Sequence, residues 1–202
     1  MRRAAIIDAA IPLLRRHGPA ITTKQIADAA GIAEGTLFRV FDDKDALIRA
    51  TVDQVMDQRP AIAALRRIDV ALPLRERLRA AVVIITARLD AVWELMFAMR
   101  MLNQPDAAGR RGRVTEPADQ EAHDALTALV GADADQLRVP PEQAARLLRL
   151  ITFAGSHPRI TNAHPLTADE IVDLLLDGVR AHSACTPSPS TPPTDANRDA
   201  PC

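Results

Sequence analysis

Three polar side chains, Thr36, Arg39 and Lys44, lie close together in the first quarter of this 202-residue chain. Threonine hydroxyls and lysine ammonium groups donate hydrogen bonds to phosphate oxygens, and an arginine guanidinium can clasp a phosphate or fork onto a guanine edge. The chemistry that these residues suggest is therefore recognition of nucleic acid. The formal net charge of the whole chain is −1, so a nucleic-acid partner has to be argued from the placement of charges and not from their sum.

Two short helices, over residues 24–30 and 33–40, are predicted to present these side chains. The first follows Thr22, which has capping-box spacing to Gln25, and it ends at Gly31. Short helices joined by a glycine-containing turn form the DNA-binding helix-turn-helix, although an ordinary helical hairpin has the same pattern. The apolar residues expected to lock the pair together are Ile26, Ala27, Ala30, Ile32, Leu37 and Phe41.

A further helix is predicted on each side of this pair. Residues 3–17 carry apolar side chains at helical spacing, and Pro12 within them predicts either a kink or a helix held by packing. Asp42 or Asp43 is expected to cap the following helix, which is predicted to continue to Arg59. These two helices would complete a small N-terminal domain.

The remainder of the chain is predicted to consist of helices joined by polar or proline-containing links. Hydrophobic residues make up 48% of the sequence and charged residues 25%, which is usual for a globular protein with a core. Few residues are aromatic and β-branched runs are short, so the expected fold class is all-α. Helices are predicted over residues 74–103, 118–130, 140–155 and 168–183, with a polar loop over 105–117 and a turn-rich link over 156–165.

The stretch ITTKQIADAAGIAEGTLFRVFDDKDALIRATV resembles the DNA-binding domain of the tetracycline-repressor (TetR) family. The matching features are the Thr-Thr cap, the Ile-Ala pair, Ala-Gly-Ile at the turn and Gly-Thr-Leu-Phe in the second helix. Together with the preceding helix they extend over about residues 4–52. The resemblance implies an N-terminal three-helix helix-turn-helix domain and a C-terminal helical domain. It also implies a homodimer on double-stranded operator DNA, released by a small-molecule effector.

The resemblance implies phosphate contacts from particular polar residues of the helix-turn-helix. These residues are Thr23, Thr36 and Lys44, and Lys24 is a further candidate at the start of the first short helix. The bonds expected are hydroxyl or ammonium donors to phosphate oxygens, which position a protein on DNA without reading its sequence. We therefore expect these contacts to strengthen binding to all DNA sequences alike.

The same resemblance implies that the second short helix meets base edges or the backbone. The residues concerned are Ala33, Glu34, Gly35 and Arg39, and Phe38 is expected to pack against the sugar–phosphate chain. Phe38 stands where the family usually has Tyr, so a phenolic contact to phosphate is lost. Arg39 is the residue expected to contribute most to sequence preference.

The predicted helices over 142–155 and 168–183 carry apolar stripes that are wide for an internal core alone. The resemblance implies that the last two main helices form a four-helix bundle across a two-fold axis. The residues by themselves leave a dimer interface and a plain core equally open. The candidates for the interface are Leu148, Ile151, Thr152, Val172, Leu175, Leu176 and Val179.

The segment LDAVWELMFAMRML, residues 89–102, is the candidate site for a ligand. It holds the single tryptophan and three of the five methionines, and methionine adapts its shape to irregular apolar molecules. The expected effector is therefore small and apolar or amphipathic, and the alternative is that these side chains are ordinary core. The candidates are Leu89, Trp93, Met96, Met99 and Arg100, the last as a partner for an acid group.

Three segments are thus expected. Residues 1–50 form the helix-turn-helix DNA-binding domain and residues 51–183 the helical ligand-binding and dimerisation domain. Residues 184–202 form a disordered tail rich in Pro, Ser and Thr, because such a composition has little apolar surface to bury.

Other chemistry is not expected from this sequence. No histidine has a second ligand at helical spacing, both cysteines lie near the C-terminus, and glycine-rich phosphate loops and nucleophile motifs are absent, so we expect no metal, no cofactor and no enzyme. No apolar run has the length of a membrane helix, and we expect a cytoplasmic protein. Two alternatives stay open: a helix-turn-helix regulator controlled by a protein partner, and a small helical module or enzyme that does not bind DNA.

Overall fold

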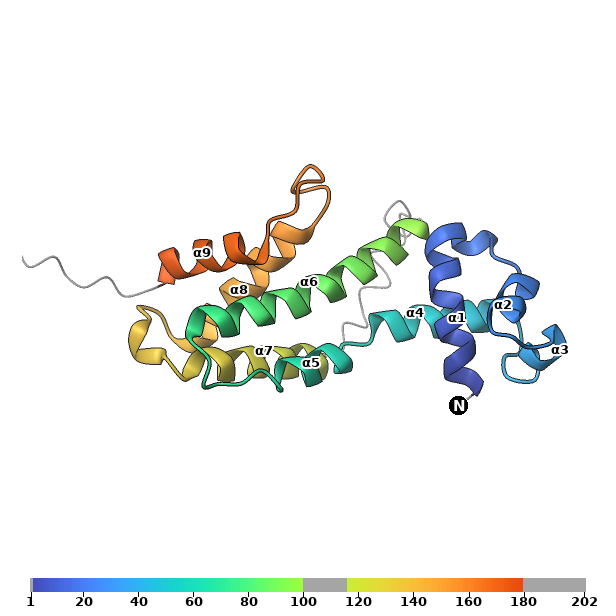
Figure 1. Ribbon diagram of the computed structural model, residues 1–202, viewed down its shortest axis with the longest axis horizontal. Helices are drawn as coiled ribbons and strands as arrows, with labels where there is room; N and C mark the ends of the chain where they lie inside the picture. The colour runs from blue at the N-terminus through green and yellow to red at the C-terminus, as the bar shows by residue number, and fades with distance from the viewer. Residues whose placement is uncertain (1, 100–115, 180–202) are drawn as a thin grey trace, which may run out of the picture.

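The computed structural model describes residues 2–99 and 116–179, and helices make up most of them (Figure 1). These segments contain no β-strand, which confirms the predicted all-α class. Short 3-10 turns follow α1 at Gly18–Ala20 and α7 at Ala134–Gln136. The α-helices in chain order are α1 (Arg2–His17), α2 (Thr23–Ala29), α3 (Glu34–Leu37), α4 (Lys44–Met56), α5 (Arg59–Leu65), α6 (Leu74–Ala98), α7 (Glu116–Gly131), α8 (Pro141–Ser156) and α9 (Ala168–Val179).

Local signals define the helices at the N-terminal end. The predicted capping box is confirmed, because the Thr22 hydroxyl accepts from the Gln25 amide and the Gln25 side chain accepts from the Thr22 amide. Gly31 follows α2 with φ +65°, a left-handed conformation that favours glycine. α3 is shorter than the predicted 33–40, since residues 38–40 form turns. α1 continues through Pro12, so packing maintains the helix despite the lost backbone hydrogen bond.

One apolar core holds α1 to α4 together. Helix α1 contributes one face of buried side chains, and the two short helices and α4 close over it. Leu95, near the end of α6, is buried in this same core. The buried side chains include Ile6, Leu14, Ile21, Ile26, Leu37, Phe41 and Leu47.

The predicted single helix from Asp43 to Arg59 is wrong at its end. α4 begins after Asp43, whose carboxylate accepts from the Ala46 amide, but it stops at Met56. The chain turns at Asp57, and α5 then begins with Pro60 in its first turn, where proline loses no helical hydrogen bond. The proline that ended the predicted helix therefore begins another one, which the sequence analysis missed.

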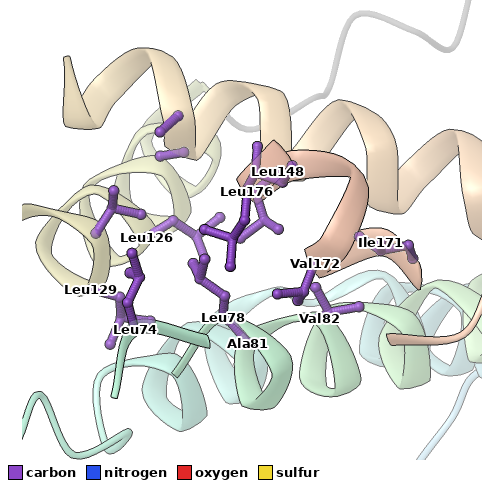
Figure 2. Packing of buried hydrophobic residues seen from close by; sticks show 14 of the residues in the cluster. Leu74, Leu78, Ala81, Val82, Leu126, Leu129, Leu148, Ile171, Val172 and Leu176 are labelled. Atoms are coloured by element: carbon purple, nitrogen blue, oxygen red, sulfur yellow. The ribbon is translucent and has the colours of Figure 1, made fainter. Parts of the chain in front are cut away.

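A second core fills the space between α6, α7, α8 and α9 (Figure 2). Leu78 of α6, Leu126 of α7, Leu148 of α8 and Val172 of α9 meet there and are almost fully buried. In the view of Figure 1, α9 lies above α6, and α5 and α7 lie below it. Arg77 is the buried charge of this region: its guanidinium donates to the carbonyls of Val70 and Leu72 and pairs with Asp133.

The boundaries of these helices agree with the sequence in part. The Thr167–Glu170 capping box that begins α9 is present, with the Thr167 amide donating to the Glu170 carboxylate over 2.7 Å. α7 begins two residues before the predicted loop ends. The rest of that loop, the end of the predicted helix 74–103 and the C-terminal tail lie outside the described residues.

The two ends of the molecule are joined by α4 and α6. α4 passes through the predicted domain limit at residue 50 without a break and leads toward α5. The end of α6 contacts α1, where Arg15 pairs with Glu94 over 3.3 Å. Gly18, with φ +58°, lies so close to the Ala98 carbonyl oxygen that a side chain there would collide with it. The position of α6 is thereby fixed against the N-terminal core.

Candidate nucleic-acid interface and ligand cavity

A hydrogen bond between side chains ties the start of α2 to the start of α3. The Thr23 hydroxyl donates to the Glu34 carboxylate over 2.5 Å. A threonine hydroxyl has a single proton, so in this arrangement Thr23 presents lone pairs outward and no donor. The expected phosphate contact from Thr23 therefore needs this bond to open.

The predicted DNA-facing residues around α3 lie at the surface. Lys24, Gly35 and Arg39 are exposed, and Thr36 is half-buried. Phe38 is 49% exposed, which leaves its ring available for contact. Ala33 is exposed as well, and its small side chain leaves the surface beside α3 open to a partner. The two short helices thus present cationic, polar and apolar groups on one exposed segment.

Lys44, the first residue of α4, has a structural contact. Its Nζ donates to the Pro19 carbonyl over 2.8 Å, and its side chain is half-buried. An ammonium group has three protons, so two remain for a phosphate. Lys44 therefore connects the turn after α1 to α4 and can still contact DNA.

Arg3, in the first turn of α1, lies near this surface. Its guanidinium lies 4.4 Å from the centroid of the Phe41 ring, and Nη1 donates to the Val40 carbonyl over 3.5 Å. These contacts attach the first turn of α1 to the end of the helix-turn-helix. The amphipathic pattern of α1 predicted the helix but not this contact, which depends on how α1 crosses α4.

A cavity of about 510 Å³ lies between α5, α6, α7 and α8. This volume is within the range of about 300–1,000 Å³ that small-molecule sites occupy. Its walls are mostly apolar, with side chains from each of the four helices. The apolar lining includes Ile62, Leu65, Ile85, Leu89, Leu126 and Phe153.

The polar lining of the cavity is dominated by arginines. Arg88 of α6 donates from Nη2 to the Met56 carbonyl at the end of α4, over 3.1 Å. Arg149 of α8 lies 3.6 Å from the Asp119 carboxylate of α7, which also accepts from Gln58 over 3.0 Å. Burial lowers the pKa of the Arg88 guanidinium below its usual value, while the nearby carboxylates act in the opposite direction. The cavity therefore combines an apolar body with a cationic wall.

The helix-turn-helix matches a known family. Residues 6–51 fit the model of the tetR family of bacterial regulatory proteins. The helix-turn-helix domain belongs to the TetR family. This family consists of regulators and not of enzymes. A curated relative, the HTH-type transcriptional regulator BetI of Burkholderia ambifaria, is 36% identical over 91 residues. That alignment covers 45% of this chain and 45% of the relative.

Solved TetR-family structures share the fold over most of the chain. A putative regulator from Vibrio parahaemolyticus superposes with a TM-score of 0.58 at 21% identity, covering 90% of this chain and all of the other. SmeT, the repressor of a Stenotrophomonas maltophilia multidrug efflux pump, superposes with a TM-score of 0.56 at 21% identity, covering 89% of this chain and 90% of that one. SmeT has also been solved as a complex with triclosan. At these identities the likeness concerns the fold.

The residues predicted to bind a ligand do not lie together. Leu89 lines the cavity, and Trp93 lies beside it, 5.2 Å from the ring of Phe153. Met96 is half-buried outside the lining, and Met99 packs against the N-terminal core instead. Arg100 lies outside the described residues. Residues 89–98 belong to a single helix, so their side chains point in different directions and only one face meets the cavity.

The residues proposed for a dimer interface require correction. Leu148, Thr152, Val172, Leu175, Leu176 and Val179 are all buried in the chain's own core, and Ile151 is half-buried against it. A side chain without exposed surface has none to bury against a partner. These six residues are therefore core, whereas Ile151 keeps exposed surface and its place in an interface stays a prediction. The large apolar side chains that these helices do expose are Leu150, Phe153 and Leu174.

Within the described residues, no group of three or more His, Cys, Asp or Glu residues is arranged to hold a metal ion. Among the helices of residues 2–99 and 116–179, none is both long and apolar enough to cross a bilayer.

Proposed function

We propose that this chain is a transcriptional repressor that binds a palindromic operator as a homodimer and leaves it when a small molecule fills the cavity. The observation that carries the proposal is the exposed segment of α2 and α3, with Lys24, Phe38 and Arg39 at the surface of a TetR-family domain. Phosphate oxygens suit the lysine, and a base edge or a phosphate suits the arginine. A bacterial DNA-binding protein of this kind acts in the cytoplasm.

A homodimer follows from the small size of one helix-turn-helix. A single unit makes few contacts, while two units related by a two-fold axis can read half-sites about 34–36 Å apart. α8 and α9 pack side by side, and Leu174 on α9 is 56% exposed. We assign the interface to the exposed face of α9, because the exposed Leu150 and Phe153 of α8 line the cavity instead.

Control by a small molecule is supported by the cavity and by α6. Arg88 and Leu89 of α6 line the cavity, and Leu95 of the same helix is buried in the N-terminal core. A ligand that displaced α6 would therefore disturb the packing beneath the helix-turn-helix. The triclosan complex of SmeT offers a precedent for a small organic molecule on this fold. An open cavity of this size favours a small effector over a protein partner.

A binding titration with labelled duplex DNA from upstream of the chain's own coding region tests the proposal. We expect saturable binding of two chains per operator, measured by fluorescence anisotropy together with sedimentation of the complex. Binding that is equally strong to a scrambled duplex, or one chain per duplex at saturation, would contradict it.

The dimer assignment is tested by Leu174→Glu, with Val70→Glu as the matched control. Val70 is 54% exposed but lies outside α8 and α9. We expect Leu174→Glu to sediment as a monomer at micromolar concentration and to bind operator weakly, because a charge would be buried at the interface. A dimer of unchanged stability would remove α9 from the interface.

A further inference from the structure

The charges that line the cavity are unbalanced. Arg88, Arg146 and Arg149 contribute three guanidinium groups, and Asp119 is the one carboxylate among the lining residues. Asp119 is already engaged, because Arg149 pairs with it and Gln58 donates to it. Arg146 is exposed and makes no ion pair within the described residues. The cavity therefore has a surplus of positive charge beside its apolar walls.

Arg88 is the member of this group best placed to receive an anion. Its Nε is buried and has no hydrogen-bond partner within the described residues, and Nη2 is bonded to the neutral Met56 carbonyl. A buried donor without an acceptor is costly. A carboxylate or phosphate can take the two N–H groups of a guanidinium side by side, with stronger bonds than a neutral carbonyl forms. An anionic group in the cavity would give this guanidinium a partner of opposite charge, and a turn of the side chain would bring the now inaccessible Nε to the anion as well.

The lining argues against a cationic ligand. Recognition of a quaternary ammonium group depends on several aromatic faces, and Phe153 is the single aromatic residue of the lining. A cationic ligand would also be repelled by Arg88 and Arg146, since Asp119 pairs with Arg149 alone. The charge of the lining and its small aromatic content therefore both favour an anionic ligand.

We propose that the effector is an anionic amphiphile, with an acid group bound by Arg88 and Arg149 and an apolar body against Ile62, Leu89 and Phe153. This inference deepens the proposed ligand control and rests on it. It names a chemical class and leaves carboxylate and phosphate head groups to be separated by experiment.

The test compares four probes with one chain length on the full-length protein. Decanoate and decyl phosphate carry the anion, 1-decanol is the neutral control and decylammonium the cationic one. Binding is measured by calorimetry below the micelle concentration, and the emission of Trp93 gives a second signal because its ring contacts Phe153. We expect at least one anionic probe to bind about tenfold or more tightly than decanol and decylammonium.

Two variants separate recognition by Arg88 from a general effect of charge. Arg88→Gln is expected to remove the preference for the anion while leaving the affinity for decanol unchanged, which also shows that the cavity is intact. Arg79→Gln loses the same charge from an exposed position of α6 and is expected to keep the preference. Arg149→Gln should reduce the affinity for the anionic probes less than Arg88→Gln does, because Arg149 already has a carboxylate partner.

The outcomes also distinguish this proposal from the proposed function. Equal binding of all probes, preference for decylammonium, or no binding of either anion would overturn the anionic class even if the protein binds DNA. Tight anion binding that depends on Arg88 but leaves operator affinity unchanged would uphold the class and refute ligand control of DNA binding.

Discussion

The helix-turn-helix and the cavity are built in opposite ways. The residues that face outward from α2 and α3 are neighbours in the chain, and each depends on a cap, a turn or a glycine within a few positions. The cavity is lined by α5, α6, α7 and α8, and residues as distant as Gln58 and Phe153 share it. A site made of sequence neighbours can be read from a motif, whereas a site made by packing exists only once the helices are assembled.

The strongest test lies in the packed C-terminal region. Arg77→Ala removes a buried guanidinium that holds the Val70 and Leu72 carbonyls and pairs with Asp133. We expect the free energy of unfolding in urea to fall by about 3–5 kcal/mol, because Arg77 is buried and its loss leaves a cavity together with three acceptors that have lost their donor. Arg79→Ala, which breaks an exposed pair with Asp169, should cost less than about 1 kcal/mol. Similar losses in both variants would show that Arg77 does not fix this region.

The contact between the helix-turn-helix domain and the end of α6 is tested by Gly18→Ala. A left-handed conformation costs a non-glycine residue about 1–2 kcal/mol, and the collision with the Ala98 carbonyl should add about 1–3 kcal/mol. Gly31→Ala is the control, since Gly31 has φ +65° with nothing within 4 Å of the added atom. Thermal or urea unfolding should therefore show a larger loss at Gly18. Equal losses would mean that α6 is not held against α1 at this place.

A smaller effect separates two lysines of the helix-turn-helix. Lys24→Ala and Lys44→Ala should each reduce the salt dependence of DNA binding by about one unit in the slope of log K against log salt. Lys44→Ala alone should also lower the free energy of unfolding, by about 1 kcal/mol, because its bond to the Pro19 carbonyl is lost. A variant of Lys44 that keeps the wild-type salt slope would remove it from the phosphate contacts.

The smallest effect is expected at the cap of α9. Hydrogen bonds from the Thr167 amide and hydroxyl lower the pKa of Glu170 below its usual value of 4.5. The cap therefore stabilises the fold above pH 4.5, and this contribution is lost as the pH falls through the lowered pKa. Glu170→Gln keeps the side-chain acceptor but does not titrate. The difference in Tm between wild type and variant should shrink on acidification, and a constant difference from pH 7 to pH 3 would contradict this assignment.

Sequence reasoning succeeded where the cause of a feature was local. The capping boxes at Thr22 and Thr167, the glycine after α2 and the cap at Asp43 all appear in the structure. It failed at Pro60, because the same residue can end one helix or begin another. The helix propensities of the residues around Asp57 do not show whether one helix continues through them or two helices meet there.

The C-terminal sites show the limit of the same reasoning. The pattern of α8 and α9 revealed that Leu148 and Val172 lie on apolar faces, but it could not say whether a face meets the chain itself or a partner, and the structure places both in the core. Arg88 and Arg149 gave no signal in sequence, since isolated arginines on amphipathic helices are usually solvated. Only the packing of α6 against α8 brings them to one cavity.

The central claim is that the exposed segment of α2 and α3 binds duplex DNA. The most direct measurement compares operator affinity for Arg39→Ala and Arg79→Ala at one salt concentration. Each variant loses one exposed cation, the first beside α3 and the second on α6. The account predicts a loss of about 1–3 kcal/mol in binding free energy for Arg39→Ala and wild-type affinity for Arg79→Ala. Equal affinities of the two variants would contradict it.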